Sequence, residues 1–242
     1  MASSPSCFGP ARIAGRLIVA LDVPTVEAAR AMAARLDGIV SFFKLGWRLI
    51  LAPGFDRLLD DLVQEGKQVF LDGKLFDIGE TVKDGVAQAA RRGVSLLTVH
   101  GDDDIIRAAV EGKAGSDLRL LAITVLTSTD DAGLEQLGYR WPVGEMIRRR
   151  VAACIRLGCD GIIASPADVA DIRRLPDAKR LLVVTPGVRL PGSARDDHKR
   201  VGSPAEAVRA GADYLVVGRP IIAAADPTAA AGRFIAEMKT AG

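Results

Sequence analysis

Eight short runs of apolar, often β-branched residues recur along the chain, and longer stretches with helical periodicity separate most of them. The runs cover residues 17–22, 40–44, 69–72, 96–100, 118–125, 161–164, 181–185 and 214–217. They are nearly continuous in apolar residues, which is typical of parallel strands covered by helices on both faces. Helical patterns occupy residues 25–36, 47–65, 82–92, 105–111, 143–157, 204–210 and 227–238. This alternation predicts an α/β protein, a single parallel eight-stranded (β/α)8 barrel of the TIM type.

An open doubly wound sheet is the alternative fold, but the first apolar run is not followed by a G-x-G-x-x-G turn. The length of 242 residues agrees with a barrel, because barrels of this kind commonly exceed about 200 residues as one domain. We therefore expect one domain over residues 16–242. Residues 1–15 are rich in Ser, Gly and Pro and are expected to form a flexible tail.

The charge balance and the cysteines exclude several classes of partner. Lys and Arg number 32 against 30 Asp and Glu, so the net charge of +2 gives no electrostatic case for a nucleic-acid or membrane partner. The apolar runs are too short to cross a bilayer, and the first is too short for a signal peptide. Cys7, Cys154 and Cys159 match no zinc or disulfide pattern. We expect a cytoplasmic protein with no bound metal.

Charged residues stand where the first three predicted strands end. In a barrel the functional residues lie at the carboxyl ends of the strands, and here these ends carry Asp22, Lys44 and Asp72. Lys74 is two residues beyond Asp72, so an extended backbone places both side chains on one face. Asp77 follows in the next loop. We expect an alternating array of Lys44, Asp72, Lys74 and Asp77; the alternative is a rim of ion pairs that only fixes the loops.

Two glycine–arginine segments follow the last two predicted strands. They read P-G-V-R at residues 186–189 and V-G-R-P at residues 217–220. Loops in these two places commonly form a phosphate site in (β/α)8 barrels. Glycine lets backbone N–H groups approach an anion, and arginine offers two parallel donors. We predict that Arg189, Gly218 and Arg219 bind a phosphate group, the alternative being ordinary turns beside surface arginines.

These motifs together resemble those of the orotidine 5′-phosphate decarboxylase family, from residue 17 almost to the end of the chain. They are L-D-V at 21–23, F-K-L-G at 43–46, D-x-K-x-x-D-I at 72–78, T-V at 81–82, T-V-H-G at 98–101, L-T-S at 126–128, P-G-V-R at 186–189 and V-G-R-P-I at 217–221. The resemblance implies an enzyme that decarboxylates orotidine 5′-monophosphate to UMP and CO₂ without a cofactor. That reaction is the last step of de novo pyrimidine biosynthesis.

The resemblance also implies how the charged residues act. Lys74 would donate a proton to the pyrimidine, and the other charges of the array would be those of Lys44, Asp72 and Asp77. The chain would form a homodimer in which one segment serves the partner subunit's site. That segment contains Asp77, Ile78 and Thr81.

Substrate contacts follow from the same resemblance. Asp22 would contact the ribose and Thr127 the pyrimidine, while the 5′-phosphate would be held by Arg189, Gly218 and Arg219. His198 stands where the family usually has a glutamine that reaches over the phosphate and base, and imidazole also donates a hydrogen bond. Phe76 replaces a frequent histidine. Residues 190–200 are rich in Gly, Asp, Lys and Arg and are predicted to form a lid over the site.

Two other functions remain open from the sequence. Mg²⁺-dependent hexulose-phosphate synthases and ketogulonate-phosphate decarboxylases share the D-x-K-x-x-D loop, but there Ala-Gly typically follows it, whereas this chain has Ile78-Gly79. A barrel that binds a nucleotide monophosphate without catalysis is the second alternative. Clustered like charges argue against it, because simple binding does not require them.

Overall fold

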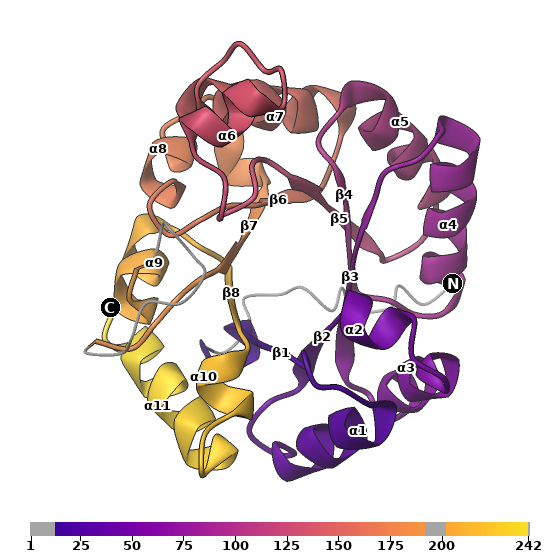
Figure 1. Cartoon of the computed structure of the whole chain (residues 1–242), viewed down its shortest axis with the longest axis vertical. Coiled ribbons are helices and arrows are strands. Elements are labelled where there is room, and N and C mark those ends of the chain that lie inside the picture. The colour runs from indigo at the N-terminus through magenta and orange to yellow at the C-terminus, as the bar shows by residue number, and fades with distance from the viewer. Residues whose placement is uncertain (1–12, 192–201, 242) are drawn as a thin grey trace, which may run out of the picture.

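Residues 13–191 and 202–241 are described by the computed structural model, and their eight strands pair in one closed parallel barrel (Figure 1). Neighbouring strands follow the order of the chain, and β1 closes the barrel by pairing with β8. The strands are β1 Leu17–Ala20, β2 Phe42–Gly46, β3 Gln68–Leu75, β4 Leu96–His100, β5 Arg119–Ile123, β6 Gly161–Ile163, β7 Leu182–Pro186 and β8 Tyr214–Val217. The predicted (β/α)8 fold is confirmed.

Helices surround the barrel and cover the outer face of its strands (Figure 1). They are α1 Val26–Arg35, α2 Trp47–Ile50, α3 Phe55–Gln64, α4 Gly79–Arg91, α5 Asp103–Gly112, α6 Asp131–Gln136, α7 Val143–Leu157, α8 Val169–Arg173, α9 Pro204–Ala210, α10 Arg219–Ile222 and α11 Pro227–Lys239. Two 3₁₀ turns, Ile13–Arg16 and Ala178–Arg180, precede β1 and β7. Within the described ranges, the helices are all too short or too polar to cross a membrane.

Apolar side chains form two layers, one inside the barrel and one between the strands and the helices. The inner layer contains Ile18, Ala20, Phe42, Phe70, Leu96, Leu121, Val184, Tyr214 and Val216. Phe42 and Tyr214 begin β2 and β8, and their rings meet edge to face with centroids 5.6 Å apart. Burial on both faces explains why the strand sequences are almost continuously apolar. The layer also fills the barrel from its amino-terminal end and supports the site above it.

The single helix predicted over residues 47–65 is instead two helices, α2 and α3. A turn containing Pro53 and Gly54 separates them, and Gly54 adopts a φ of +83°. Proline in a helix interior removes a hydrogen bond, and a left-handed residue ends the helical path, so the pattern of apolar residues does not carry the helix across. The short helix α2 follows the carboxyl end of β2 directly.

Candidate active site

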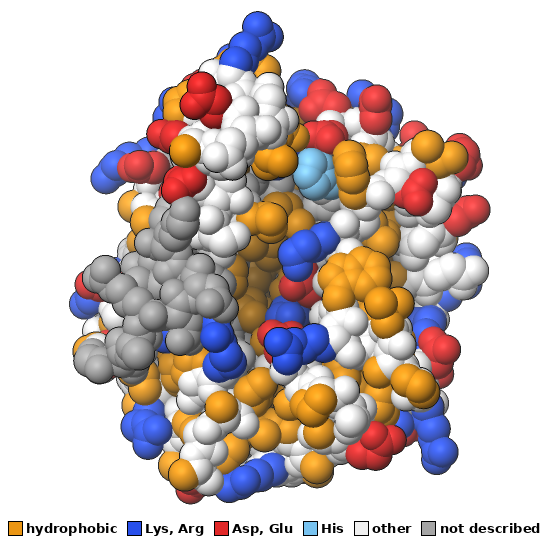
Figure 2. Space-filling view, in the orientation of Figure 1, with side chains coloured by type: hydrophobic (Ala, Val, Ile, Leu, Met, Phe, Trp, Pro, Cys, Tyr) orange, Lys and Arg blue, Asp and Glu red, His pale blue; other side chains and the backbone are white. Residues whose placement is uncertain are grey.

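A cavity of about 480 Å³ opens at the carboxyl ends of the barrel strands. Its size falls within the range of small-molecule sites, roughly 300–1,000 Å³. Figure 2 shows the hollow near the middle of this face, with apolar side chains in its depth and charged ones at its rim. Ala20, Phe70, Ile123, Ile163 and Val216 contribute apolar lining from the strands. Among the predicted site residues, the cavity is lined by Asp22, Lys44, Asp72, Lys74, Thr127, Arg189, Gly218 and Arg219.

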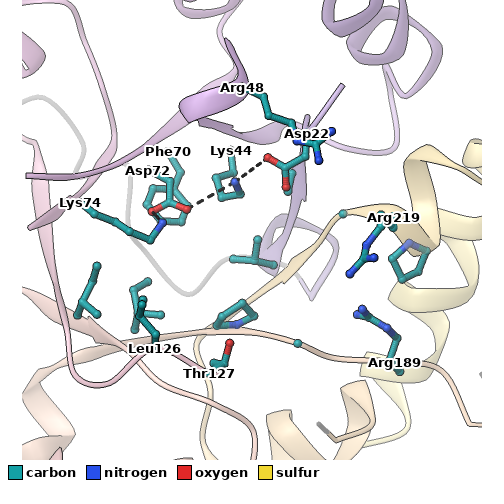
Figure 3. Close-up of a pocket in the computed structure, with 18 of the residues that line it drawn as sticks. Asp22, Lys44, Arg48, Phe70, Asp72, Lys74, Leu126, Thr127, Arg189 and Arg219 are labelled. Carbon is teal, nitrogen blue, oxygen red and sulfur yellow. Dashed lines mark hydrogen bonds and ion pairs between the residues drawn. The ribbon is translucent and has the colours of Figure 1, made fainter. Parts of the chain in front are cut away.

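Four charged side chains alternate in sign along one wall of the cavity (Figure 3). Lys44 Nζ lies 3.1 Å from Asp22 Oδ1 and 3.5 Å from Asp72 Oδ2. Lys74 Nζ lies 2.7 Å from Asp72 Oδ1. Lys44 is buried, so its ammonium group is shielded from water and held by the two carboxylates. The resulting chain of contacts is Asp22–Lys44–Asp72–Lys74, and its members come from three adjacent parts of the barrel.

Within a single chain, the array contains Asp22 and lacks Asp77, and so it differs from the array expected from the sequence. Lys44, Asp72 and Lys74 come together as predicted, and Asp22 extends the array beyond Lys44. Asp77 does not line the cavity, and its Oδ1 accepts a hydrogen bond from the Ile78 N–H at 2.7 Å.

Opposing effects set the ionisation of Asp72. Burial by itself raises the pKa of its carboxyl group, because a charged group loses its hydration. The positive charges of Lys44 and Lys74, together with hydrogen bonds from Lys74 and Thr98, more than offset this and leave the pKa of Asp72 below its ordinary value. Asp72 is thus an anion at neutral pH, placed between the side chains of Lys44 and Lys74.

Lys74 has an unusual backbone conformation. Its φ of +48° lies in the left-handed region, which costs a residue other than glycine roughly 1–3 kcal/mol. The pairing of β3 with β4 is also irregular between Leu71 and Leu75. Regular extended geometry was the basis for expecting Asp72 and Lys74 on one face, and that reason is wrong. The two side chains meet on a strand whose backbone and pairing are locally irregular.

Two arginines lie on the other side of the cavity from Lys74. Arg189 follows β7 and Arg219 begins α10, and both guanidinium groups point toward the same part of the cavity (Figure 3). Gly218 lies beside them, and a Cβ atom placed there would come within 3.4 Å of the Ala20 side chain and 3.6 Å of Asp22 Oδ2. A side chain at this position would therefore narrow the cavity between the arginines and the charged array.

The remaining predicted residues occupy different places. Thr127 lines the cavity next to Leu126, after the end of β5. Ile78 and Thr81 do not line the cavity of their own chain, and Ile78 is 73% exposed. His198 and residues 192–200 of the predicted lid lie outside the described residues.

Two residues near the array were missed by the sequence reasoning. Arg48, in the short helix α2, lines the cavity close to Asp22 (Figure 3). The sequence feature that pointed to Arg48 was its position four residues after Lys44, just beyond the end of a predicted strand. Thr98, in β4, is fully buried and hydrogen-bonds to both Asp72 and Lys74. In the sequence, Thr98 stands out as a hydroxyl between the apolar residues Leu97 and Val99.

Comparison with known proteins agrees with this geometry. The family described as "Orotidine 5'-phosphate decarboxylase / HUMPS family" matches residues 15–234. A protein of Cereibacter sphaeroides named orotidine 5′-phosphate decarboxylase is 50% identical over 229 residues, which cover 94% of this chain and 98% of that protein. One of Bradyrhizobium diazoefficiens with the same name is 48% identical over 231 residues, covering 95% and 97%. The crystal structure of orotidine 5′-phosphate decarboxylase from Lactobacillus acidophilus superposes with a TM-score of 0.79 at 33% identity, over 93% of this chain and 99% of that one.

Proposed function

The chain belongs to the orotidine 5′-phosphate decarboxylase / HUMPS family, and we propose that Lys74 and the charges around it carry out decarboxylation of orotidine 5′-monophosphate to UMP and CO₂. This reaction belongs to pyrimidine biosynthesis. The observation that carries the proposal is the Asp22–Lys44–Asp72–Lys74 array, which shares one cavity with two arginines. The array suits a developing negative charge, and the arginines suit a phosphate.

The chemistry requires stabilisation of an electron pair that the ring does not delocalise. When the C6–carboxylate bond breaks, the pair remains in an orbital at C6 that lies in the plane of the pyrimidine. CO₂ leaves, and a proton from the Lys74 ammonium forms the new C6–H bond. Enzymes lower such barriers by about 8–23 kcal/mol. A fixed cation next to C6 supplies electrostatic stabilisation without a cofactor, because its orientation is set before the bond breaks.

Asp72 orients the Lys74 side chain. Its Oδ1 accepts a hydrogen bond from Lys74 Nζ at 2.7 Å, while Lys44 Nζ lies 3.5 Å from Oδ2 on the other side. Since the pKa of Asp72 is lowered, its carboxylate remains charged at neutral pH and holds the Lys74 side chain in place. We propose that Asp72 also lies near the departing carboxylate of the substrate.

The arginine side of the cavity binds the nucleotide away from the reacting carbon. Arg189 and Arg219 hold the 5′-phosphate with Gly218, and Asp22 contacts the ribose. Thr127 contacts the pyrimidine, and His198 is proposed to close over the phosphate and base. Binding energy gained at the phosphate then places C6 against Lys74. This lowers the activation barrier of decarboxylation as well as the substrate concentration needed for half-maximal rate.

We propose further that two chains form a dimer in which Asp77 completes the partner subunit's array. Asp77 stands beside two exposed apolar residues, Phe76 at 66% and Ile78 at 73% exposure. Exposed apolar residues that cluster in this way commonly mark a protein interface. In a two-fold dimer the same segment of each chain faces its partner, so Asp77, Ile78 and Thr81 would approach the other subunit's Lys74.

Mixing two inactive variants tests this shared site. Lys74→Ala and Asp77→Ala homodimers are each expected to be nearly inactive. After random exchange of subunits, half of the dimers are mixed, and each mixed dimer has one intact site, so about a quarter of the wild-type activity is expected to return. Decarboxylation after mixing, unfolding and refolding measures it. No recovery in a mixture that size-exclusion chromatography shows to contain dimers would contradict the shared site.

A metal chelator separates this function from the Mg²⁺-dependent relatives. Decarboxylation of orotidine 5′-monophosphate, followed by the loss of its ultraviolet absorbance, is expected to proceed at the same rate with and without EDTA. The reason is that Lys74, rather than a metal ion, stabilises the charge at C6 in the proposed mechanism. Activity that EDTA removes and added Mg²⁺ restores would instead favour metal-dependent chemistry.

A further inference from the structure

Thr98 joins the backbone and the side-chain partner of Lys74 through one hydroxyl group. The Lys74 N–H donates a hydrogen bond to Thr98 Oγ1 at 3.0 Å, and the same hydroxyl donates to Asp72 Oδ1 at 2.9 Å. We propose that Thr98 is a positioning residue for Lys74, which it holds in the orientation that decarboxylation requires. The proposal rests on the function of Lys74 proposed above.

The irregular pairing of β3 with β4 creates the need for this hydroxyl. Leu71 pairs with Leu97, and Leu75 pairs with Val99. The residues between them, 72–74, therefore lie opposite Thr98 alone. Where one strand carries extra residues, the ladder of backbone hydrogen bonds is interrupted. The Lys74 N–H then needs another acceptor, and Thr98 Oγ1 supplies it.

The direction of both hydrogen bonds is fixed by chemistry. A backbone N–H only donates, so Thr98 accepts from Lys74. An ionised carboxylate only accepts, so the Thr98 O–H must point toward Asp72. Asp72 Oδ1 also accepts from Lys74 Nζ at 2.7 Å. Thr98 therefore acts at both ends of Lys74: directly at its backbone nitrogen, and through Asp72 at its ammonium group.

Burial and backbone strain make this arrangement sensitive to loss of the hydroxyl. Thr98 is fully buried, so water does not replace the hydroxyl without a change in packing. Lys74 has a φ of +48°, a conformation that surrounding contacts must maintain. Without Thr98 Oγ1, the loop is expected to relax and the ammonium to move relative to C6. Misplacement of a reacting group by about 1 Å costs on the order of 10²-fold in rate.

The test replaces Thr98 by one residue that keeps its shape and by another that keeps its hydroxyl group. Thr98→Val keeps the shape but removes the hydroxyl, and it is expected to lower kcat by about 10- to 100-fold. KM and the Kd for UMP are expected to change less than about threefold, because the phosphate and ribose contacts remain. Thr98→Ser keeps the hydroxyl and is expected to retain kcat within about threefold. Amide hydrogen exchange at Lys74 should be faster in Thr98→Val than in Thr98→Ser.

Thr185→Val is the matched control. Thr185 is a fully buried threonine of β7, and the described residues offer its Oγ1 no hydrogen-bond partner. The same substitution there is expected to leave kcat unchanged. If Thr98→Val does not fold, Thr98→Ala compared with Thr98→Ser provides the same contrast.

Three results would overturn the positioning role. They are a kcat for Thr98→Val within about threefold of wild type, an equal loss in Thr98→Ser, or a change confined to KM. The variant Lys74→Ala, assayed in parallel, separates this failure from a failure of the proposed function. If Lys74→Ala is inactive while Thr98→Val is normal, only the role of Thr98 is wrong. If Lys74→Ala is active, the function proposed for Lys74 is wrong as well.

Discussion

Replacing Lys74 by alanine is expected to lower kcat for decarboxylation by more than about 10⁴-fold while the protein still folds and binds UMP. In the proposed mechanism, the substitution removes both the proton donor and the cation nearest the developing charge at C6. The fold should persist because the Lys74 side chain is partly exposed and lies at the end of β3, outside both apolar layers. Single-turnover assays measure the rate, and circular dichroism measures the fold.

A second lysine provides the control for this experiment. Lys83 in α4 has a partly exposed side chain, and its Nζ lies 3.7 Å from Glu111 Oε2. It does not line the cavity. Lys83→Ala should therefore keep its turnover rate. If Lys74→Ala turns over within about tenfold of wild type, Lys74 is not the proton donor, since such donors contribute about 10²- to 10⁴-fold.

Replacing Arg219 by alanine is expected to lower kcat/KM by about 10²- to 10⁴-fold, which corresponds to roughly 3–5 kcal/mol. Charge-assisted hydrogen bonds from a guanidinium group to a phosphate are among the strongest that a protein makes. Part of that binding energy places C6 beside Lys74, so kcat should fall as well as affinity. Steady-state kinetics of wild type, Arg219→Ala and Arg233→Ala measure the effect. Arg233 is exposed in α11 and lies outside the cavity, so its substitution should have no effect.

A substrate without phosphate shows whether the loss arises at the phosphate. Orotidine lacks the group that Arg219 is proposed to bind, so Arg219→Ala and wild type should decarboxylate orotidine at equal, low rates. The rates of wild type and Arg219→Ala, each measured with and without the substrate phosphate, form a double-mutant-type cycle. Its coupling energy is the interaction between Arg219 and the phosphate. An equal loss with orotidine and with its 5′-monophosphate would show that Arg219 acts through the structure of the site instead.

The fold was predictable because its signals are local and repeated. Most strand residues are buried on both faces, so the runs of apolar residues mark the strands without reference to distant contacts. Some boundaries differ from the prediction: the strand predicted at 17–22 ends at Ala20, and the helix predicted at 47–65 is interrupted at Pro53 and Gly54. The apolar pattern continues through this turn, so the interruption is visible only in the turn-forming residues themselves.

The site was predictable where its residues end strands, and not where contacts depend on distortion. The meeting of Lys44, Asp72 and Lys74 follows from the rule that carboxyl ends of neighbouring strands share one edge of a barrel. The left-handed backbone of Lys74 and its contact with Thr98, 24 residues away in sequence, depend on irregular pairing between β3 and β4. Spacing within one segment contains no information about such a contact.

The inner apolar layer decides how molecules reach and leave the site. Phe42 and Tyr214 fill the barrel at its amino-terminal end, and Phe70 lies above them at the floor of the cavity. Substrate, UMP and CO₂ must therefore all pass through the same opening of the cavity, at the carboxyl ends of the strands. While the nucleotide is bound, the released CO₂ has to pass beside it, so in the proposed mechanism the geometry of this opening governs how easily CO₂ leaves before it recombines with the carbanion.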